Sequence, residues 1–98
     1  EPTLADSLLG GIGLDNQYTY DIVKDYVDET VQVNEEEIAN GMAYIMENHK
    51  VIAEGASCVG IAYCMREGVI KPGSNVAIIV TGCGVPMEQI KEIVNTNF

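Results

Sequence analysis

The sequence predicts an α/β fold with parallel strands, in the element order loop–α–β–α–α–β–α. Three observations support this class. The nearly uninterrupted apolar run 75–80 is typical of a strand covered on both faces. A strong start signal precedes a helix over 35–49, and helical patterns flank both candidate strands. The 98 residues suit one small domain or part of a larger one.

The first elements are short. Residues 1–17 are rich in glycine and leucine without steady periodicity, so we expect irregular backbone that lies close to another group. Thr19 can cap a helix over 20–27, and the alternating residues 30–33 then predict a strand. The inward face of that helix would consist of Ile22, Val23, Tyr26 and Val27.

The clearest local signal is the start of the next helix. Asn34 can accept from the backbone of Glu37, whose carboxylate can reach back, which is the arrangement of a capping box. Three carboxylates at 35–37 also suit the positive end of the helix dipole. We expect this helix to end near His49 and to bury one face, formed by Ile38, Met42, Ile45, Met46 and His49.

The second half of the chain is predicted to contain two more helices and one more strand. A helix rich in small residues is predicted over 56–67, with Gly68 as its C-cap and a turn at 71–73. After the strand at 75–80, Pro86 opens a last helix. The inward residues of that helix would be Met87, Ile90, Ile93 and Val94.

Composition excludes several function classes. Fifteen acidic and five basic side chains give a net charge of −10, which opposes binding to nucleic acid and to anionic membranes. No apolar run reaches the roughly 18 residues of a membrane helix, and no signal peptide is visible. We read the three cysteines as reduced thiols of a cytoplasmic protein, and no residues have metal-ligand spacing. Because residue 1 is Glu, we expect a longer parent chain.

The best candidate for a site is the end of the apolar strand, Val80-Thr81-Gly82-Cys83-Gly84. Ligands of α/β sheets bind outside the carboxyl ends of strands, where a hydroxyl can reach them and glycines let backbone approach. The same residues also suit a simple turn. Glu54 is either a helix-start charge or a polar group that faces a pocket.

Several segments resemble one known family in order and spacing. They are Thr3-Leu4-Ala5-Asp6, Val27-Asp28-Glu29-Thr30-Val31, Val33-Asn34-Glu35-Glu36-Glu37-Ile38, His49-Lys50-Val51-Ile52-Ala53-Glu54-Gly55-Ala56 and Val76-Ala77-Ile78-Ile79-Val80-Thr81-Gly82. Together they resemble the C-terminal part of threonine/serine dehydratases, which are fold-type II pyridoxal-phosphate enzymes. Residues 7–16 are similar to the dehydratase branch associated with ectoine breakdown.

The resemblance implies roles for four residues that would face the cofactor. Thr81 occupies the position whose hydroxyl or thiol hydrogen-bonds the pyridine nitrogen, and Gly82 follows it as in the family. Ser7 stands where a small residue lies against the ring, and Glu54 matches an acid near the cofactor edge. The family continues with Gly-Gly-Asn, whereas this chain continues from Gly82 with Cys83 and Gly84.

The resemblance also implies what the chain lacks. None of its lysines lies in a segment like the family's cofactor-binding lysine motif, so we expect no catalytic residue here and an inactive chain on its own. The parent would be a pyridoxal-phosphate-dependent lyase that eliminates water from a small hydroxy-amino acid and assembles as a homo-oligomer. Its missing N-terminal part would supply the lysine. The alternative is a non-catalytic, self-associating module; a regulatory domain fits the pattern less well.

Overall fold

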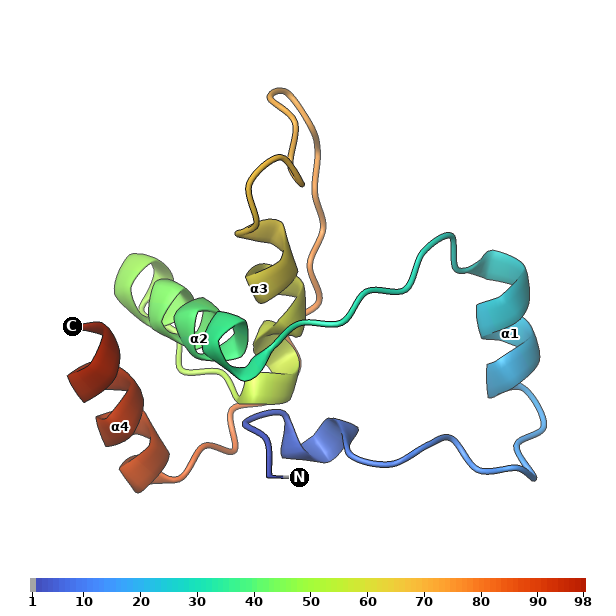
Figure 1. Cartoon of the computed structure of the whole chain (residues 1–98), viewed down its shortest axis with the longest axis horizontal. Coiled ribbons are helices and arrows are strands. Elements are labelled where there is room, and N and C mark those ends of the chain that lie inside the picture. Colours follow the sequence, from blue (N-terminus) through green and yellow to red (C-terminus); the bar gives the residue numbers. More distant parts are fainter. Residues whose placement is uncertain (1) are drawn as a thin grey trace.

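Helical elements form all the regular secondary structure in residues 2–98, the part of the chain that the computed structural model describes. Two short 3-10 turns accompany the four α-helices (Figure 1). In chain order the elements are η1 (Asp6–Leu8), α1 (Thr19–Tyr26), α2 (Glu35–His49), η2 (Gly55–Cys58), α3 (Val59–Cys64) and α4 (Met87–Asn97).

The prediction of an α/β fold with parallel strands is wrong for the described residues, because they contain no strand. Segments 30–33 and 75–80 both run as extended chain, but within residues 2–98 no backbone hydrogen bond joins them. A strand exists only when its N–H and C=O groups pair with those of a neighbour. The sequence pattern marked both segments correctly as extended, but within residues 2–98 neither has a neighbouring strand with which to pair.

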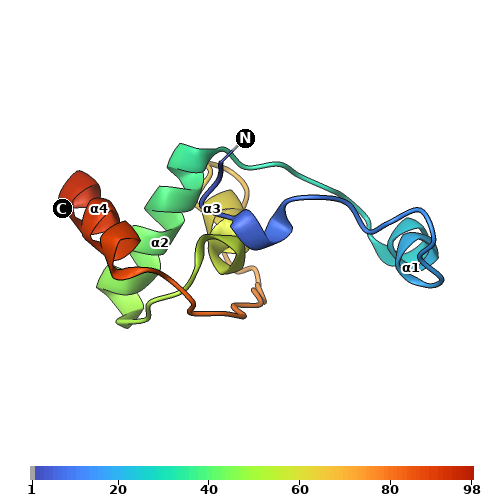
Figure 2. The same ribbon diagram turned by 90° about the horizontal axis from the view of Figure 1, so that it is seen from below.

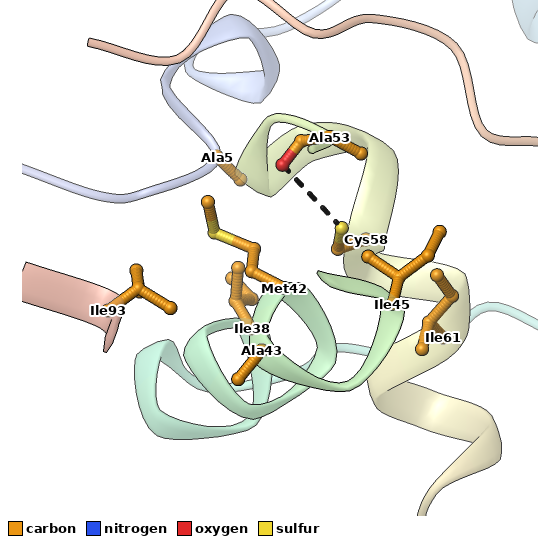
Figure 3. Close-up of a cluster of buried hydrophobic side chains, with 9 residues drawn as sticks. All are labelled: Ala5, Ile38, Met42, Ala43, Ile45, Ala53, Cys58, Ile61 and Ile93. Atoms are coloured by element: carbon orange, nitrogen blue, oxygen red, sulfur yellow. Dashed lines mark hydrogen bonds between the residues drawn. The ribbon is translucent and has the colours of Figure 1, made fainter. Parts of the chain in front are cut away.

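The core lies around α2, which starts and ends as predicted. Asn34 Oδ1 accepts from the backbone N–H of Glu37 at 2.8 Å, while Glu37 Oε1 accepts from the N–H of Asn34 at 3.0 Å. Lys50, with φ of 56°, ends the helix in the left-handed conformation. Figure 3 shows the buried cluster that α2 forms with its neighbours, namely Ala5, Ile38, Met42, Ala43, Ile45, Ala53, Cys58, Ile61 and Ile93.

An ion pair joins the start of α2 to the turn that follows α3. Arg66 Nε donates to Glu37 Oε2 at 2.5 Å, and Arg66 Nη2 donates to Glu37 Oε1 at 2.9 Å and to the carbonyl of Gln32 at 2.7 Å. The hydrogen bond from Arg66, together with the one from the Asn34 backbone, lowers the pKa of Glu37 from 4.5 to about 2. The pair therefore fixes where the chain enters α2.

The single helix predicted over 56–67 is divided and shorter. η2 forms its first turn, and α3 ends at Cys64 with Met65 as its C-cap. Gly68 is thus not the C-cap; it adopts φ of 79° in the following turn. The predicted turn at 71–73 is present, with the N–H of Ser74 donating to the carbonyl of Lys71 at 3.1 Å.

Helix α1 projects away from the core at the end of two long extended segments (Figures 1 and 2). It begins at Thr19, but Asn16 rather than Thr19 receives a backbone N–H, that of Tyr20, at 3.0 Å. The radius of gyration is 14.9 Å, above the roughly 13 Å of a compact chain of this length. The face predicted to be buried is exposed at each of its four positions, Ile22, Val23, Tyr26 and Val27.

Helix α4 follows Pro86, as predicted, and packs on α2. Of its predicted inward residues, Ile93 is buried, Ile90 is half-buried, and Met87 and Val94 are exposed. In residues 2–98 no helix has both the length and the apolar character needed to cross a membrane. No group of three or more His, Cys, Asp and Glu side chains in that range is placed to hold a metal ion.

Candidate functional site

The apolar segment 75–80 passes α3 and ends in a bend beside η2, which we call the Thr81 corner (residues 81–84). The backbone N–H of Glu54, just before η2, donates to the carbonyl of Gly82 at 3.0 Å. This bond joins two segments that lie far apart in the sequence. It places the segment that carries Thr81 next to Glu54.

Ser57 is the main side-chain anchor of this corner. Its Oγ accepts from the backbone N–H of Gly82 at 2.7 Å and of Thr81 at 3.2 Å, and it lies 2.8 Å from Thr81 Oγ1. Ser57 is only 3% exposed, whereas Thr81 is exposed. The buried serine thus attaches the corner to the core, while residue Thr81 itself is exposed.

Glu54 supports the same corner from its other side. Its carboxylate accepts from the backbone N–H of Gly84 at 3.0 Å. A Cβ on Gly82 would lie 2.7 Å from the Glu54 carboxyl carbon, so the end of the Glu54 side chain would have to move away from the corner. Glycine at position 82 therefore has a packing reason: it lets the backbone lie against the acid.

Ser7 approaches η2 from the N-terminal segment. It lies in η1, is exposed, and forms no side-chain hydrogen bond with the Thr81 corner within the described chain. The segment before it lies against η2, because the carbonyl oxygen of Leu4 is so close to Gly55 that a Cβ there would overlap with it. η2 therefore lies between two segments that were predicted to face one cofactor (Figure 2).

The structure thus brings Glu54 into direct contact with Gly82, the neighbour of Thr81 in the chain, and places Ser7 in η1, which packs on η2. Sequence reasoning missed Ser57, which forms more hydrogen bonds to the corner than Glu54 does. Nothing in the small-residue stretch around it distinguishes this serine. Only the contact across 24 residues of sequence reveals it.

The thiols nearest the corner differ in environment. Cys83 belongs to the corner and is exposed, whereas Cys58 follows Ser57 and is fully buried. Burial raises the pKa of the Cys58 thiol to about 11, so this sulfur is held as an uncharged packing group. Its only hydrogen bond in the described residues is a long one to the carbonyl of Ala53, at 3.9 Å.

The chemistry of the corner fits one edge of an aromatic cofactor. It offers an exposed, neutral hydroxyl on Thr81, a side-chain-free backbone at Gly82, and a carboxylate on Glu54 that is already engaged by an amide. A neutral hydroxyl can donate to a ring nitrogen without placing a charge beside it. The residues present therefore suit the pyridine nitrogen edge of pyridoxal phosphate.

Comparison with known proteins shows the family of the chain. Residues 1–82 match the family described as "Pyridoxal-phosphate dependent enzyme", a range that contains all four predicted cofactor-facing residues. The chain therefore belongs to the pyridoxal-phosphate-dependent enzyme family, which confirms the resemblance seen in the sequence.

Individual relatives show which enzymes of this family the chain is similar to. The chain is 41% identical to an L-threonine ammonia-lyase of Thermotoga maritima, over 97% of this chain and 23% of the relative. It is 31% identical to the L-threonine dehydratase catabolic TdcB of Staphylococcus aureus, over 96% of this chain and 28% of the relative. It is 28% identical to the L-threo-3-hydroxyaspartate ammonia-lyase of Saccharomyces cerevisiae, over 81% of this chain and 24% of the relative.

The chain spans about a quarter of the length of these curated relatives. No solved structure matches it. The likeness of residues 7–16 to the ectoine-associated branch stays a prediction.

Proposed function

We propose that this chain forms the pyridine-nitrogen edge of the active site in a pyridoxal-phosphate-dependent lyase that eliminates water from a small hydroxy-amino acid. Family membership and the names of the relatives support the reaction class, because threonine and 3-hydroxyaspartate both carry a hydroxyl on the β-carbon. The observation that carries the proposal is the accessible Thr81 hydroxyl, hydrogen-bonded to Ser57 at 2.8 Å at the end of segment 75–80.

The proposed roles follow from the contacts. Thr81 would donate a hydrogen bond to the ring nitrogen, and the contact between Gly82 and Glu54 would hold the corner in place at the cofactor edge. Ser7, on η1, would lie against the ring. When bound, pyridoxal phosphate withdraws electrons from the substrate, and a neutral partner at the ring nitrogen makes it a milder electron sink that suits loss of water.

The lysine that binds the cofactor would come from elsewhere in the parent enzyme. Lys24, Lys50, Lys71 and Lys91 are all exposed and none belongs to the Thr81 corner. We therefore propose that the 98-residue chain is inactive alone, and that the covalent anchor and the base for the α-proton lie on another segment. The three free thiols fit a cytoplasmic parent.

A chimera tests this proposal directly. The segment of the Thermotoga maritima ammonia-lyase that matches this chain is replaced by residues 1–98, and keto-acid release from L-threonine is measured. We expect the chimera to bind cofactor and to be active. Thr81→Asp places a carboxylate at the ring nitrogen and replaces a neutral hydrogen bond worth about 0.5–1.5 kcal/mol, so kcat should fall by roughly two- to tenfold.

Two control variants separate this role from a loss of folding. Thr81→Ser keeps the hydroxyl and should keep most of the activity. Thr30→Asp adds the same charge at an exposed threonine far along the chain from the corner and should have no effect. An active chimera in which Thr81→Asp and Thr30→Asp behave alike would overturn the role assigned to Thr81.

We also propose that the isolated chain associates with copies of itself, because it exposes many apolar side chains. Leu14, Tyr26 and Ile79 are 106%, 80% and 83% exposed, and the face of α1 has no partner in the described chain. Large exposed apolar patches drive association, although the net charge of −10 opposes it. Light scattering decides the matter: an increase in mass with concentration supports association, and a constant monomer mass contradicts it.

A further inference from the structure

The side-chain oxygen of Ser57 lies within hydrogen-bond distance of four polar groups. The N–H groups of Gly82 and Thr81 donate to it at 2.7 and 3.2 Å. Thr81 Oγ1 lies 2.8 Å away, and the carbonyl of Gly82 lies 3.3 Å away. The number of protons and lone pairs therefore restricts how this network can be arranged.

Counting the groups gives the direction of each bond. A serine hydroxyl has one proton and two lone pairs. The two backbone N–H groups occupy both lone pairs, so the oxygen has no room for a third donor. The hydroxyl of Thr81 therefore cannot donate to Ser57, and the Ser57 proton points to the closer acceptor, Thr81 Oγ1, rather than to the more distant carbonyl of Gly82.

We propose that Ser57 is a positioning residue that turns the proton of the Thr81 hydroxyl outward, away from the core. Because Thr81 Oγ1 accepts the proton of Ser57, its own proton is turned away from the core. Within residues 2–98 that proton has no other partner, and the side chain is exposed. This inference rests on the proposed function. The outward proton of Thr81 would form a hydrogen bond with the ring nitrogen of the cofactor, so that this nitrogen would carry no proton of its own.

The position of Ser57 suits such a task. Its side chain is almost fully buried, and its own backbone N–H donates to the carbonyl of Glu54 at 2.9 Å, which fixes the η2 turn. A mobile surface serine could rotate and accept from Thr81. Ser57 cannot do so without giving up one of the two backbone N–H groups from which it accepts.

The first test uses the 98-residue chain without cofactor. Ser57→Ala removes the acceptor of the Gly82 amide, so hydrogen exchange of that amide, followed by NMR, should become roughly tenfold faster or more. Thr81→Val keeps the acceptor and should leave this amide protected. Ser74→Ala, at an exposed turn serine, is the matched control and should change nothing.

The second test uses the chimera with bound cofactor and follows its visible absorbance as a function of pH. With the network intact, the ring nitrogen would face the outward proton of Thr81, so the spectrum should show no pH-dependent transition from protonation of that nitrogen. In Ser57→Ala nothing directs the Thr81 proton outward, so the hydroxyl can instead accept from a protonated ring nitrogen, and the spectrum should acquire such a transition. If Ser57→Ala fails to fold, Ser57→Cys replaces it, since a thiol is a poor acceptor and a weak donor.

The outcomes distinguish this inference from the proposed function. A chimera without bound cofactor contradicts the proposed function and, with it, the inference. A chimera that binds cofactor but whose spectrum is equally insensitive to pH in wild type and in the Ser57 variant overturns the inference alone. Unchanged Gly82 exchange in Ser57→Ala overturns it too, independently of any cofactor.

Discussion

Gly55→Ala is the change for which the structure gives the most definite consequence. The added Cβ would stand 2.2 Å from the carbonyl oxygen and 2.5 Å from the carbonyl carbon of Leu4, and 3.0 Å from the nitrogen of Ala5. All three atoms belong to backbone, so no side-chain rotation can relieve the contact. The segment that carries η1 must move by roughly an ångström to restore ordinary van der Waals separation.

The energetic consequence follows from what holds that segment. Ala5 is 5% exposed within the core, and the carboxylate of Glu35 accepts from the N–H of Leu4 at 2.8 Å and from the hydroxyl of Thr3. Overpacking at such a contact costs about 1–3 kcal/mol. We therefore expect the free energy of unfolding of Gly55→Ala to fall by about that amount.

Urea unfolding of the 98-residue chain, followed by far-ultraviolet circular dichroism, measures this effect. With a slope of about 1–3 kcal/mol per molar urea, the midpoint should decrease by on the order of 1 M. Gly11→Ala is the matched control, because a Cβ there meets no atom within 4 Å and its φ is not in the left-handed region. Equal midpoints for Gly55→Ala and wild type would show that Leu4 and Gly55 do not make this contact.

Three further predictions concern the core, the ion pair and the thiols. Met42→Ala, at a side chain 1% exposed, should lower the free energy of unfolding by about 2–5 kcal/mol in urea titration, whereas Met87→Ala, at a residue 66% exposed, should change it by less than about 0.5 kcal/mol. The lowered pKa of Glu37 means that its ion pair contributes fully above pH 4.5 and is lost as pH falls toward about 2. Glu37→Gln should remove that part of the acid dependence in pH-resolved thermal unfolding, and an unchanged pH dependence would contradict the pair. In mass-spectrometric alkylation of the folded chain, exposed Cys83 should react first and buried Cys58, with a pKa of about 11, last; the reverse order would contradict the packing.

Local signals in the sequence were sufficient for some elements. The capping box between Asn34 and Glu37 requires only residues three positions apart, and it marks the start of α2 correctly. Pro86 before α4 is a signal of the same kind. Such motifs are reliable because every group that satisfies them lies within one helical turn.

Elements that depend on distant partners were not predictable in the same way. The alternation at 30–33 and the apolar run at 75–80 indicate extended backbone, but a sheet requires pairing that a pattern cannot specify. The amphipathic pattern of α1 likewise predicts an apolar face without saying what covers it. In the described chain nothing does, and Tyr26 is 80% exposed.

The candidate site shows the same division. The sequence pattern singled out the segment with Thr81 and Gly82, and also Glu54, and the family resemblance supplied their roles; the structure brings Glu54 against Gly82. Ser57 lies in a run of small residues that suggests only close packing. Its importance depends on hydrogen bonds to residues 24 and 25 positions away, which no spacing rule reveals.

The most direct measurement of the central claim is the NMR chemical shift of an isotopically labelled ring nitrogen in cofactor bound to the chimera. If the Thr81 hydroxyl faces that nitrogen as a neutral donor, the shift will report a nitrogen that accepts a hydrogen bond but carries no proton, and Thr81→Asp will move it to the protonated value. A protonated nitrogen in the unaltered chimera, or a shift that does not respond to Thr81→Asp, would contradict the placement of this hydroxyl at the cofactor.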